Sequence, residues 1–501
     1  KSGVLVSSLV LFAGNAIAAS YDAGGGSATG SESVAIGDGA TSQGIGSVAM
    51  GQYAKAVGTN TTAIGSGTTA DGNDATAVGN NAQAIGMYST AVGNLAKANE
   101  KYSTALGYEA TAEAERSTAI GMNALVKGVG AKDSMAIGNG TEVTGAYGVA
   151  LGQEAKVTDS HSSAVGYKAE ANSSGSVAIG TFAKTFGVNS AALGNSAKAS
   201  GSESLALGRS AEASGSASNA IGWKANATAQ NATAIGSGAT ADGDNATAVG
   251  GLAKANQDYS NALGYEATAE AERSTAIGMN ALVKGVGAKD SMAIGNGTEV
   301  TGAYGVALGQ EAKVTDSHSS AVGYKAEANS SGSVAIGTFA KTFGVNSAAL
   351  GNSAKASGSE SLALGRSAEA SGSASNAIGW KANATAQNAT ALGSNAQANG
   401  RASFAQGASA LASGDGSISI GDSSSATGTS SIAVGQRANA TGINSGAIGP
   451  EAEALGNDSF AVGTRAKALA NYSTALGNQA TATKEFDLAA GYKAKASGGQ
   501  S

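Results

Sequence analysis

One short pattern recurs along almost the whole chain and constrains the fold more than any other feature. The triplet alanine, apolar residue, glycine appears at Ala49-Met50-Gly51 and again, 14 residues later, at Ala63-Ile64-Gly65. Its closing glycine, which we call the anchor glycine, occurs 33 times between Gly37 and Gly491, and only Gln406 and Ser419 depart from the triplet. Thirty of the 32 intervals are 14 residues long; the two that end at Gly138 and Gly295 are 17. Such a period predicts a solenoid of stacked coils.

Each repeat predicts one coil, which we call a rung, made of two short strands and two turns. The first strand is expected to read Ser-x-Ala-Ile-Gly and the second Ala-x-Ala, as in Ala54-Lys55-Ala56. Side chains alternate along a strand, so the alanines should face inward and Lys55 should face water. The 76 glycines, with Asn and Asp, suit tight turns with positive φ. Helices are disfavoured, because an anchor glycine would cost a helix about 1 kcal/mol in each repeat.

A column of apolar side chains is predicted on the outward face of the first strand. There the alanine of the triplet and the anchor glycine share one face, so the residue just before the anchor points the other way. Two facing rows of alanine make a thin coil that gains little burial, at roughly 25 cal/mol per Å², and leave this column uncovered. The simplest way to cover the column is an assembly of several copies of the chain around a symmetry axis, in which each copy covers the column of the others. The residues expected to face that axis are Ile36, Met50, Ile64, Val78, Val92, Leu106, Ile120 and Gln406, the last being the only polar residue in the column.

Composition and charge exclude several other classes of protein. Charged residues make up 13% of the chain and there is one proline, which fits neither a highly charged disordered chain nor a collagen. The chain has no cysteine, so it has no disulfide framework, no thiolate metal site and no cysteine nucleophile. The net charge of −6 disfavours nucleic acid or an anionic membrane as a partner.

The N-terminal residues have the features of an export signal. An apolar run over residues 4–12 precedes Ala16-Ile17-Ala18-Ala19, whose small residues have the spacing that a signal peptidase recognises. The run is too short to span a bilayer about 30 Å thick. We expect residues 1–19 to be the C-terminal part of a signal peptide, 20–28 a glycine-rich leader and 29–501 the repeat region. A short buried strand or helix is the alternative interpretation of the apolar run.

Residues that could carry catalysis or bind a metal are few. The two histidines, His161 and His318, are one position seen twice, because residues 105–234 recur unchanged as residues 262–391, offset by 157. A single histidine in a surface turn is typically solvated. Asp71-Gly72-Asn73-Asp74 is similar to a calcium turn, but the nine-residue repeat of calcium-binding solenoids is missing. We therefore predict no catalytic residue, no metal site and no cofactor, and we assign no ligand-binding residue.

Two further columns have both a binding and a packing interpretation. A file of threonines on consecutive rungs is compatible with an ice-binding ladder, but β-branched residues that fill a strand explain it better, because the file is single and ends at Met135. Its members are Thr62, Thr76, Thr90, Thr104 and Thr118. Tyrosines that lie five residues before an anchor glycine could contact a ligand or pack on the neighbouring rung. They include Tyr88, Tyr102, Tyr147 and Tyr472.

The repeats resemble those of a known family. Ser33-Val34-Ala35-Ile36-Gly37 and Ser176-Val177-Ala178-Ile179-Gly180, with the Ala-x-Ala-x-Gly continuation, are similar to the head repeats of trimeric autotransporter adhesins of the YadA type. The resemblance covers residues 29 to 497 and implies a left-handed parallel β-roll, three chains around one axis and a role in attachment. In that family a coiled-coil stalk and a C-terminal membrane barrel follow the head. This sequence shows neither heptads nor barrel strands, so the anchor is inferred from the resemblance alone.

Three classes of function remain after these observations. The first is a bacterial adhesin head that attaches to host cells, to extracellular matrix or to other bacteria through many weak contacts. The second is an enzyme built on a solenoid, but acyltransferase helices repeat in hexapeptides with 18-residue turns, which 14-residue rungs do not fit. The third is a non-binding spacer or a phage-type fibre that only sets reach. We predict the first: an exported, homotrimeric protein of the bacterial outer surface, associated with virulence, that is not an enzyme.

Overall fold

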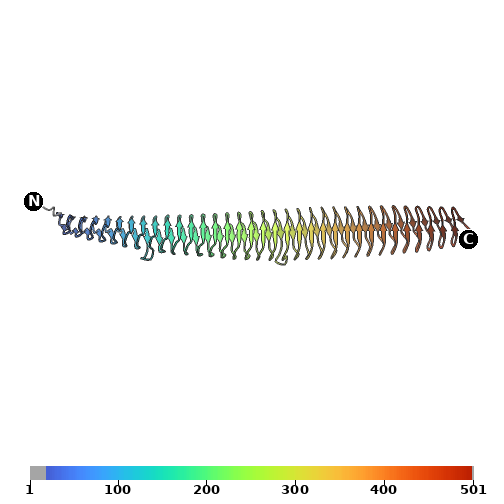
Figure 1. Cartoon of the computed structure of the whole chain (residues 1–501), viewed down its shortest axis with the longest axis horizontal. Helices are drawn as coiled ribbons and strands as arrows, with labels where there is room; N and C mark the ends of the chain where they lie inside the picture. The colour runs from blue at the N-terminus through green and yellow to red at the C-terminus, as the bar shows by residue number, and fades with distance from the viewer. Residues whose placement is uncertain (1–18, 499–501) are drawn as a thin grey trace. The chain divides into compact units, whose positions relative to one another are not determined.

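The computed structural model describes residues 19–498, which divide into two compact units, residues up to 232 and residues from 233 onward. All regular elements of this described part are β-strands, and no helix in it is long and apolar enough to cross a membrane. Each unit is a parallel β-solenoid in which the strands of successive rungs lie side by side (Figure 1). The signal peptide expected over residues 1–19 lies outside the described residues, apart from its last position.

Every rung has the same two strands at the same distance from its anchor glycine. A three-residue strand ends one residue before the anchor, as β5 (Val48–Met50) does before Gly51, and a two-residue strand begins four residues after it, as β6 (Lys55–Ala56) does. This rule gives the bounds of all strands from β3 (Val34–Ile36) to β68 (Lys495–Ala496). The first unit ends with β30 (Asn226–Ala227), and the second begins with β31 (Thr233–Ile235). The strands are shorter than expected, because the flanking serine, the anchor and the first alanine of Ala-x-Ala lie in turns.

The stack of the first unit begins earlier than the repeat pattern suggested. Strands β1 (Tyr21–Ala23) and β2 (Ser27–Ala28) pair in parallel with β3 and with β4 (Thr41–Ser42). Residues 20–28, which we expected to be a leader, therefore supply a further rung. The backbone there follows the neighbouring rung although the alanine-apolar-glycine triplet is absent.

Identical positions of successive rungs stack directly on one another. Strand β5 pairs in register with β7 (Thr62–Ile64), so Ala49 lies beside Ala63 and Met50 beside Ile64. The 17-residue intervals keep this register, because β15 (Thr118–Ile120) still pairs residue for residue with β17 (Met135–Ile137). The three extra residues leave the stack as a loop after the two-residue strand, seen near residue 130 and, in the second unit, near residue 287 (Figure 1).

The interior of the rungs is built mainly from alanine and serine, with valine or threonine in some rungs, for example Val126 and Thr61. Ala49, Ala54 and Ala56 have no exposed surface, whereas Lys55 is exposed, which confirms the predicted alternation. Many buried serine hydroxyls bond to backbone carbonyls, as Ser47 Oγ does to Gly44 O at 2.6 Å. Among the described residues, six buried serine hydroxyls have no hydrogen-bond partner, those of Ser89, Ser218, Ser375, Ser403, Ser417 and Ser431. A buried hydroxyl without such a partner would cost free energy, so the small polar residues are tolerated where the backbone accepts their hydrogen bonds.

The anchor glycine is required by contact between rungs as well as by the turn. Gly65 has φ of 130°, which side-chain-bearing residues rarely adopt, and a Cβ on it would lie 2.2 Å from the carbonyl oxygen of Gly79 in the next rung. Backbones therefore meet at this position with no room for a side chain. This explains why the glycine recurs in every rung.

Candidate functional site

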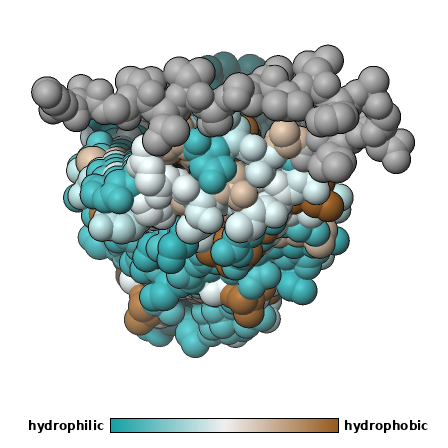
Figure 2. Space-filling view, turned by 90° about the vertical axis from the view of Figure 1, so that its left-hand side faces the viewer, coloured by the Kyte–Doolittle hydropathy of each residue, from teal (hydrophilic) through white to brown (hydrophobic). Residues whose placement is uncertain are grey.

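The predicted axis column forms a continuous outward file on the three-residue strands. Ile36, Met50 and Ile64 are in register with one another, and the file continues through Val78, Val92, Leu106 and Ile120. None of these seven side chains is buried by its own chain; Met50 and Leu106 keep 39% and 40% of their surface exposed. Viewed from the left-hand side of Figure 1, hydrophobic residues reach the surface in patches between hydrophilic ones (Figure 2).

Gln406 occupies the same position in the second unit. It ends β55 (Phe404–Gln406) and lies between Leu392 and Ile420 of the adjoining rungs. Its side chain is exposed on the single chain. The amide would need new hydrogen-bond partners if another copy covered the column.

A second column runs beside the first on the same outward face, two residues earlier in each strand. The threonine file belongs to it, since Thr62, Thr76 and Thr90 stack in register and are half-buried. Valine, methionine and leucine take this position in other rungs, for example Val48 and Leu205. The threonines therefore continue a mixed column of strand-forming residues, in agreement with the packing interpretation.

The turn tyrosines pack on their neighbours and remain partly exposed. The rings of Tyr88 and Tyr102 stack with centroids 5.0 Å apart and planes 4° apart, and Tyr472 stacks on Phe486 in the same way. Tyr147 stacks on His161 at 4.9 Å, as Tyr304 does on His318. The two histidines thus have an aromatic neighbour in the adjoining rung.

The possible calcium turn is held by hydrogen bonds between rungs. Asn73 Oδ1 accepts a bond from the Thr59 amide at 3.0 Å, and Asn60 Nδ2 donates to Asp74 Oδ1 at 3.2 Å. Across residues 19–498 no three histidine or carboxylate side chains gather as a metal-binding group. The Asp and Asn side chains of this turn support the stack.

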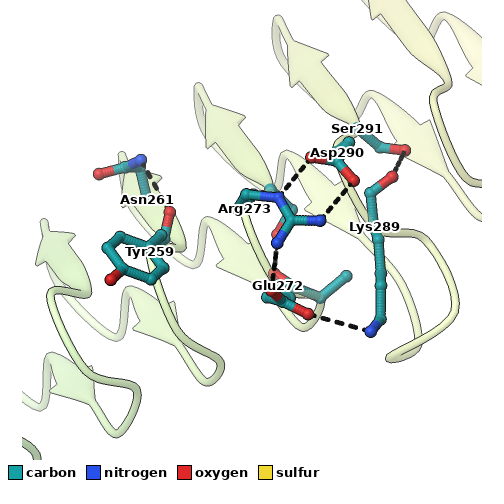
Figure 3. A network of polar contacts seen from close by, with 9 residues as sticks. Tyr259, Asn261, Glu272, Arg273, Lys289, Asp290 and Ser291 are labelled. Atoms are coloured by element: carbon teal, nitrogen blue, oxygen red, sulfur yellow. Dashed lines mark hydrogen bonds and ion pairs between the residues drawn. The ribbon is translucent and has the colours of Figure 1, made fainter.

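An ion-pair network closes the base of each projecting loop. In the second unit Arg273 binds Asp290 through two hydrogen bonds of 2.6 and 2.9 Å, and Lys289 binds Glu272 at 3.0 Å (Figure 3). The bond from Arg273 lowers the pKa of Asp290, and the bond from Lys289 lowers the pKa of Glu272. Both carboxylates are therefore ionised at neutral pH and connect the loop to the preceding rung. At the loop tip, Val286 is 63% exposed.

A shallow groove runs over the outer face of the two-residue strands in each unit. In the second unit it has a volume of about 400 Å³ and is lined by Leu252, Lys254, Glu266, Thr268, Asn280 and Leu282. The first unit has a groove of about 280 Å³ at the matching positions, lined by Leu95, Lys97, Glu109 and Thr111. The grooves are open and combine one lysine with one glutamate, so they mark a polar surface rather than an enclosed pocket.

Comparison with known families identifies the repeat. Nineteen matches to the family model of the YadA head domain repeat, described as two copies, span most of residues 28–480, from 28–54 to 454–480. The chain belongs to the YadA head family. No curated protein matches it. The YadA head repeat indicates a region of a trimeric autotransporter adhesin, a class exposed on the bacterial surface, and it confirms the predicted family and the 14-residue rung of this YadA-type head.

Two exposed residues of this YadA-type head were not among the candidate binding residues chosen from the sequence. Trp223 and Trp380, the only tryptophans of the chain, lie in turns directly after an anchor glycine. They are 46% and 40% exposed, and each lies against two cationic side chains. Two features of the sequence could have indicated them: tryptophan is rare in this chain, and a lysine follows each of the two tryptophans.

Proposed function

We propose that the chain is the head of a homotrimeric adhesin that attaches bacteria to host cells, to extracellular matrix or to one another. The observation that supports this most is the outward apolar column, which continues through the rungs with Gln406 as its one polar member. A column of this length in water favours association, and a symmetric assembly lets each copy cover the others. Three copies of a left-handed β-roll around one axis, as the family resemblance implies, would place the column at that axis.

The surface left outside such a trimer is suited to many weak contacts. Lys, Glu, Asn and Thr recur at the outward position of the two-residue strands, and ion pairs such as Lys156–Glu142 and Lys184–Glu170 join neighbouring rungs. The same side chains are thus presented repeatedly, in three chains, which favours avidity over one deep pocket. The role proposed is attachment without catalysis or cofactor, after export directed by residues 1–19.

Bacteria that display the full-length protein test this proposal. They should adhere to immobilised matrix proteins or host cells, or aggregate, and deletion of residues 29–497 should abolish all of these. Surface antibody labelling of a tag outside the head controls for display. Adhesion and aggregation that persist after the head is removed would contradict the adhesive role and leave the head as a spacer.

A further inference from the structure

Each unit carries an exposed indole flanked by two cations. Trp380 follows β51 (Asn376–Ile378); the guanidinium carbon of Arg366, from the preceding rung, lies 5.6 Å from its ring centroid, and Lys381 Nζ lies 4.7 Å away. In the first unit Arg209 and Lys224 lie 5.5 and 4.8 Å from Trp223. Cations over an aromatic face are attracted to it, so the indole holds two positive charges at the surface.

These cations have no carboxylate partner among the described residues. Glu369 lies on β50 (Glu369–Ala370) of the same rung as Arg366, but its carboxylate pairs with Lys355 at 3.0 Å. Glu212 likewise pairs with Lys198 at 2.8 Å in the first unit. The positive charge at each indole is therefore not neutralised, although the chain as a whole carries a net charge of −6.

The rungs that follow Trp380 leave part of its indole uncovered, since the side chain is 40% exposed. Arg366 occupies the position of Trp380 in the preceding rung, whereas the two following rungs have Ser394 and Ala408 there, whose side chains are too short to cover the indole. Strands of successive rungs are about 4.8 Å apart, so these two rungs provide an open surface about 10 Å long beside the indole. In the sequence, Ser237 and Gly251 follow Trp223 at the same positions.

We propose that each tryptophan site binds an acidic sugar unit of a surface glycan. The apolar C–H face of a hexose ring would lie against the indole, while the guanidinium and ammonium groups bind its carboxylate or sulfate by charge-assisted hydrogen bonds. An acidic peptide fits less well, because aspartate and glutamate side chains have no flat apolar face to lie against the indole. This inference rests on the proposed adhesive role, and it names the class of ligand.

Intrinsic fluorescence tests the proposal on the whole assembled protein. Because Trp223 and Trp380 are the only tryptophans, all indole emission reports on these two sites. Addition of heparin, a sulfated uronic-acid polysaccharide, should change the emission saturably, and about 1 M salt, where the screening length is about 3 Å, should reverse the change. Neutral dextran should have no effect, and polyglutamate should act only at much higher concentration.

Two matched charge variants separate this site from general attraction of a polyanion. Arg209→Gln with Arg366→Gln keeps both indoles and should weaken heparin binding at least about tenfold, or 1.4 kcal/mol. Lys127→Gln with Lys284→Gln removes the same charge from another duplicated and exposed position, beside the projecting loops, and should change affinity less than about twofold.

Several results would overturn the proposal. They are an emission that does not respond to heparin, an equal response to polyglutamate, equal effects of the two variants, or indoles that acrylamide cannot quench because the assembled protein covers them. Bacterial adhesion distinguishes this from failure of the wider function. If heparin has no effect on the emission while adhesion still depends on the head, only the proposed glycan site is wrong. If heparin binds while adhesion persists after deletion of the head, the proposed adhesive role is wrong.

Discussion

Replacement of the anchor glycine Gly365 by alanine should destabilise the rung that contains it. Gly365 has φ of 136°, and an added Cβ would lie 2.4 Å from the carbonyl oxygen of Gly379 in the next rung. The strained backbone costs about 1–3 kcal/mol and the overpacking about 1–3 kcal/mol, while the reduced freedom of the unfolded chain returns less than about 1 kcal/mol. We therefore expect a loss of about 2–5 kcal/mol per chain in the free energy of unfolding.

Gly287→Ala is the matched control within the same unit. Gly287 lies in the projecting loop, its φ is not positive, and no heavy atom lies within 4 Å of an added Cβ. The change in stability should be within about 0.5 kcal/mol. The two substitutions thus make the same chemical change in a crowded and in an open position.

Hydrogen exchange followed by mass spectrometry, together with thermal unfolding, measures the difference. Because each rung contacts only its neighbours, Gly365→Ala should lower protection mainly in residues 351–393, whereas Gly287→Ala should leave protection of the stack unchanged. If Gly365→Ala retained full protection there and full thermal stability, the direct contact of anchor glycines between rungs would be refuted.

Three further substitutions or deletions follow from the same geometry. If Gln406 faces the trimer axis, Gln406→Leu should leave the melting temperature unchanged or raise it, with a change in stability of about 1 kcal/mol per chain, and a large loss of stability would indicate a specific polar layer. The pKa of Asp290 in the folded chain lies below its ordinary value of 3.8, because Arg273 binds the carboxylate. The ion pair therefore stabilises the loop fully above pH 3.8, and this stabilisation is lost as the pH falls through the lower pKa of the folded chain. Asp290→Asn should therefore speed tryptic cleavage at Lys284 and Lys289 at neutral pH, whereas Asp422→Asn should not; equal rates would contradict the role of the ion pair. Deletion of residues 105–261 removes eleven whole rungs, the length of the 157-residue duplication, so the fold and the melting temperature should be retained. Electron microscopy should show a stack that is shorter by about 53 Å. Misfolding, or a much smaller decrease in length, would contradict the assignment of one rung to each repeat.

The 14-residue period of the sequence was sufficient to predict most of the fold. Alternation along short strands was sufficient to place Ala54 and Ala56 inside and Lys55 outside, because a side-chain period of two has only two possible assignments. It also placed Met50 and Gln406 on one outward column. The rung formed by residues 20–28 was missed, because backbone pairing with β3 and β4 substitutes there for the repeat motif.

The candidate binding sites were harder to predict, because they depend on contacts between rungs. The stacking of Tyr147 on His161 and the closure of a loop by Arg273 and Asp290 each join residues 14 or 17 positions apart. The period shows that such residues are neighbours, but it does not show which rotamers bring their side chains together. For the same reason Trp380 was not linked to Arg366 until the turns were placed.

In the proposed trimer, three copies bury the outward apolar column around one axis. Sedimentation equilibrium of the chain from residue 20 onward, at micromolar concentration and without denaturant, tests this directly. A homotrimer should sediment as a single species with three times the mass of the chain. A stable, soluble monomer that keeps the column in water would contradict it.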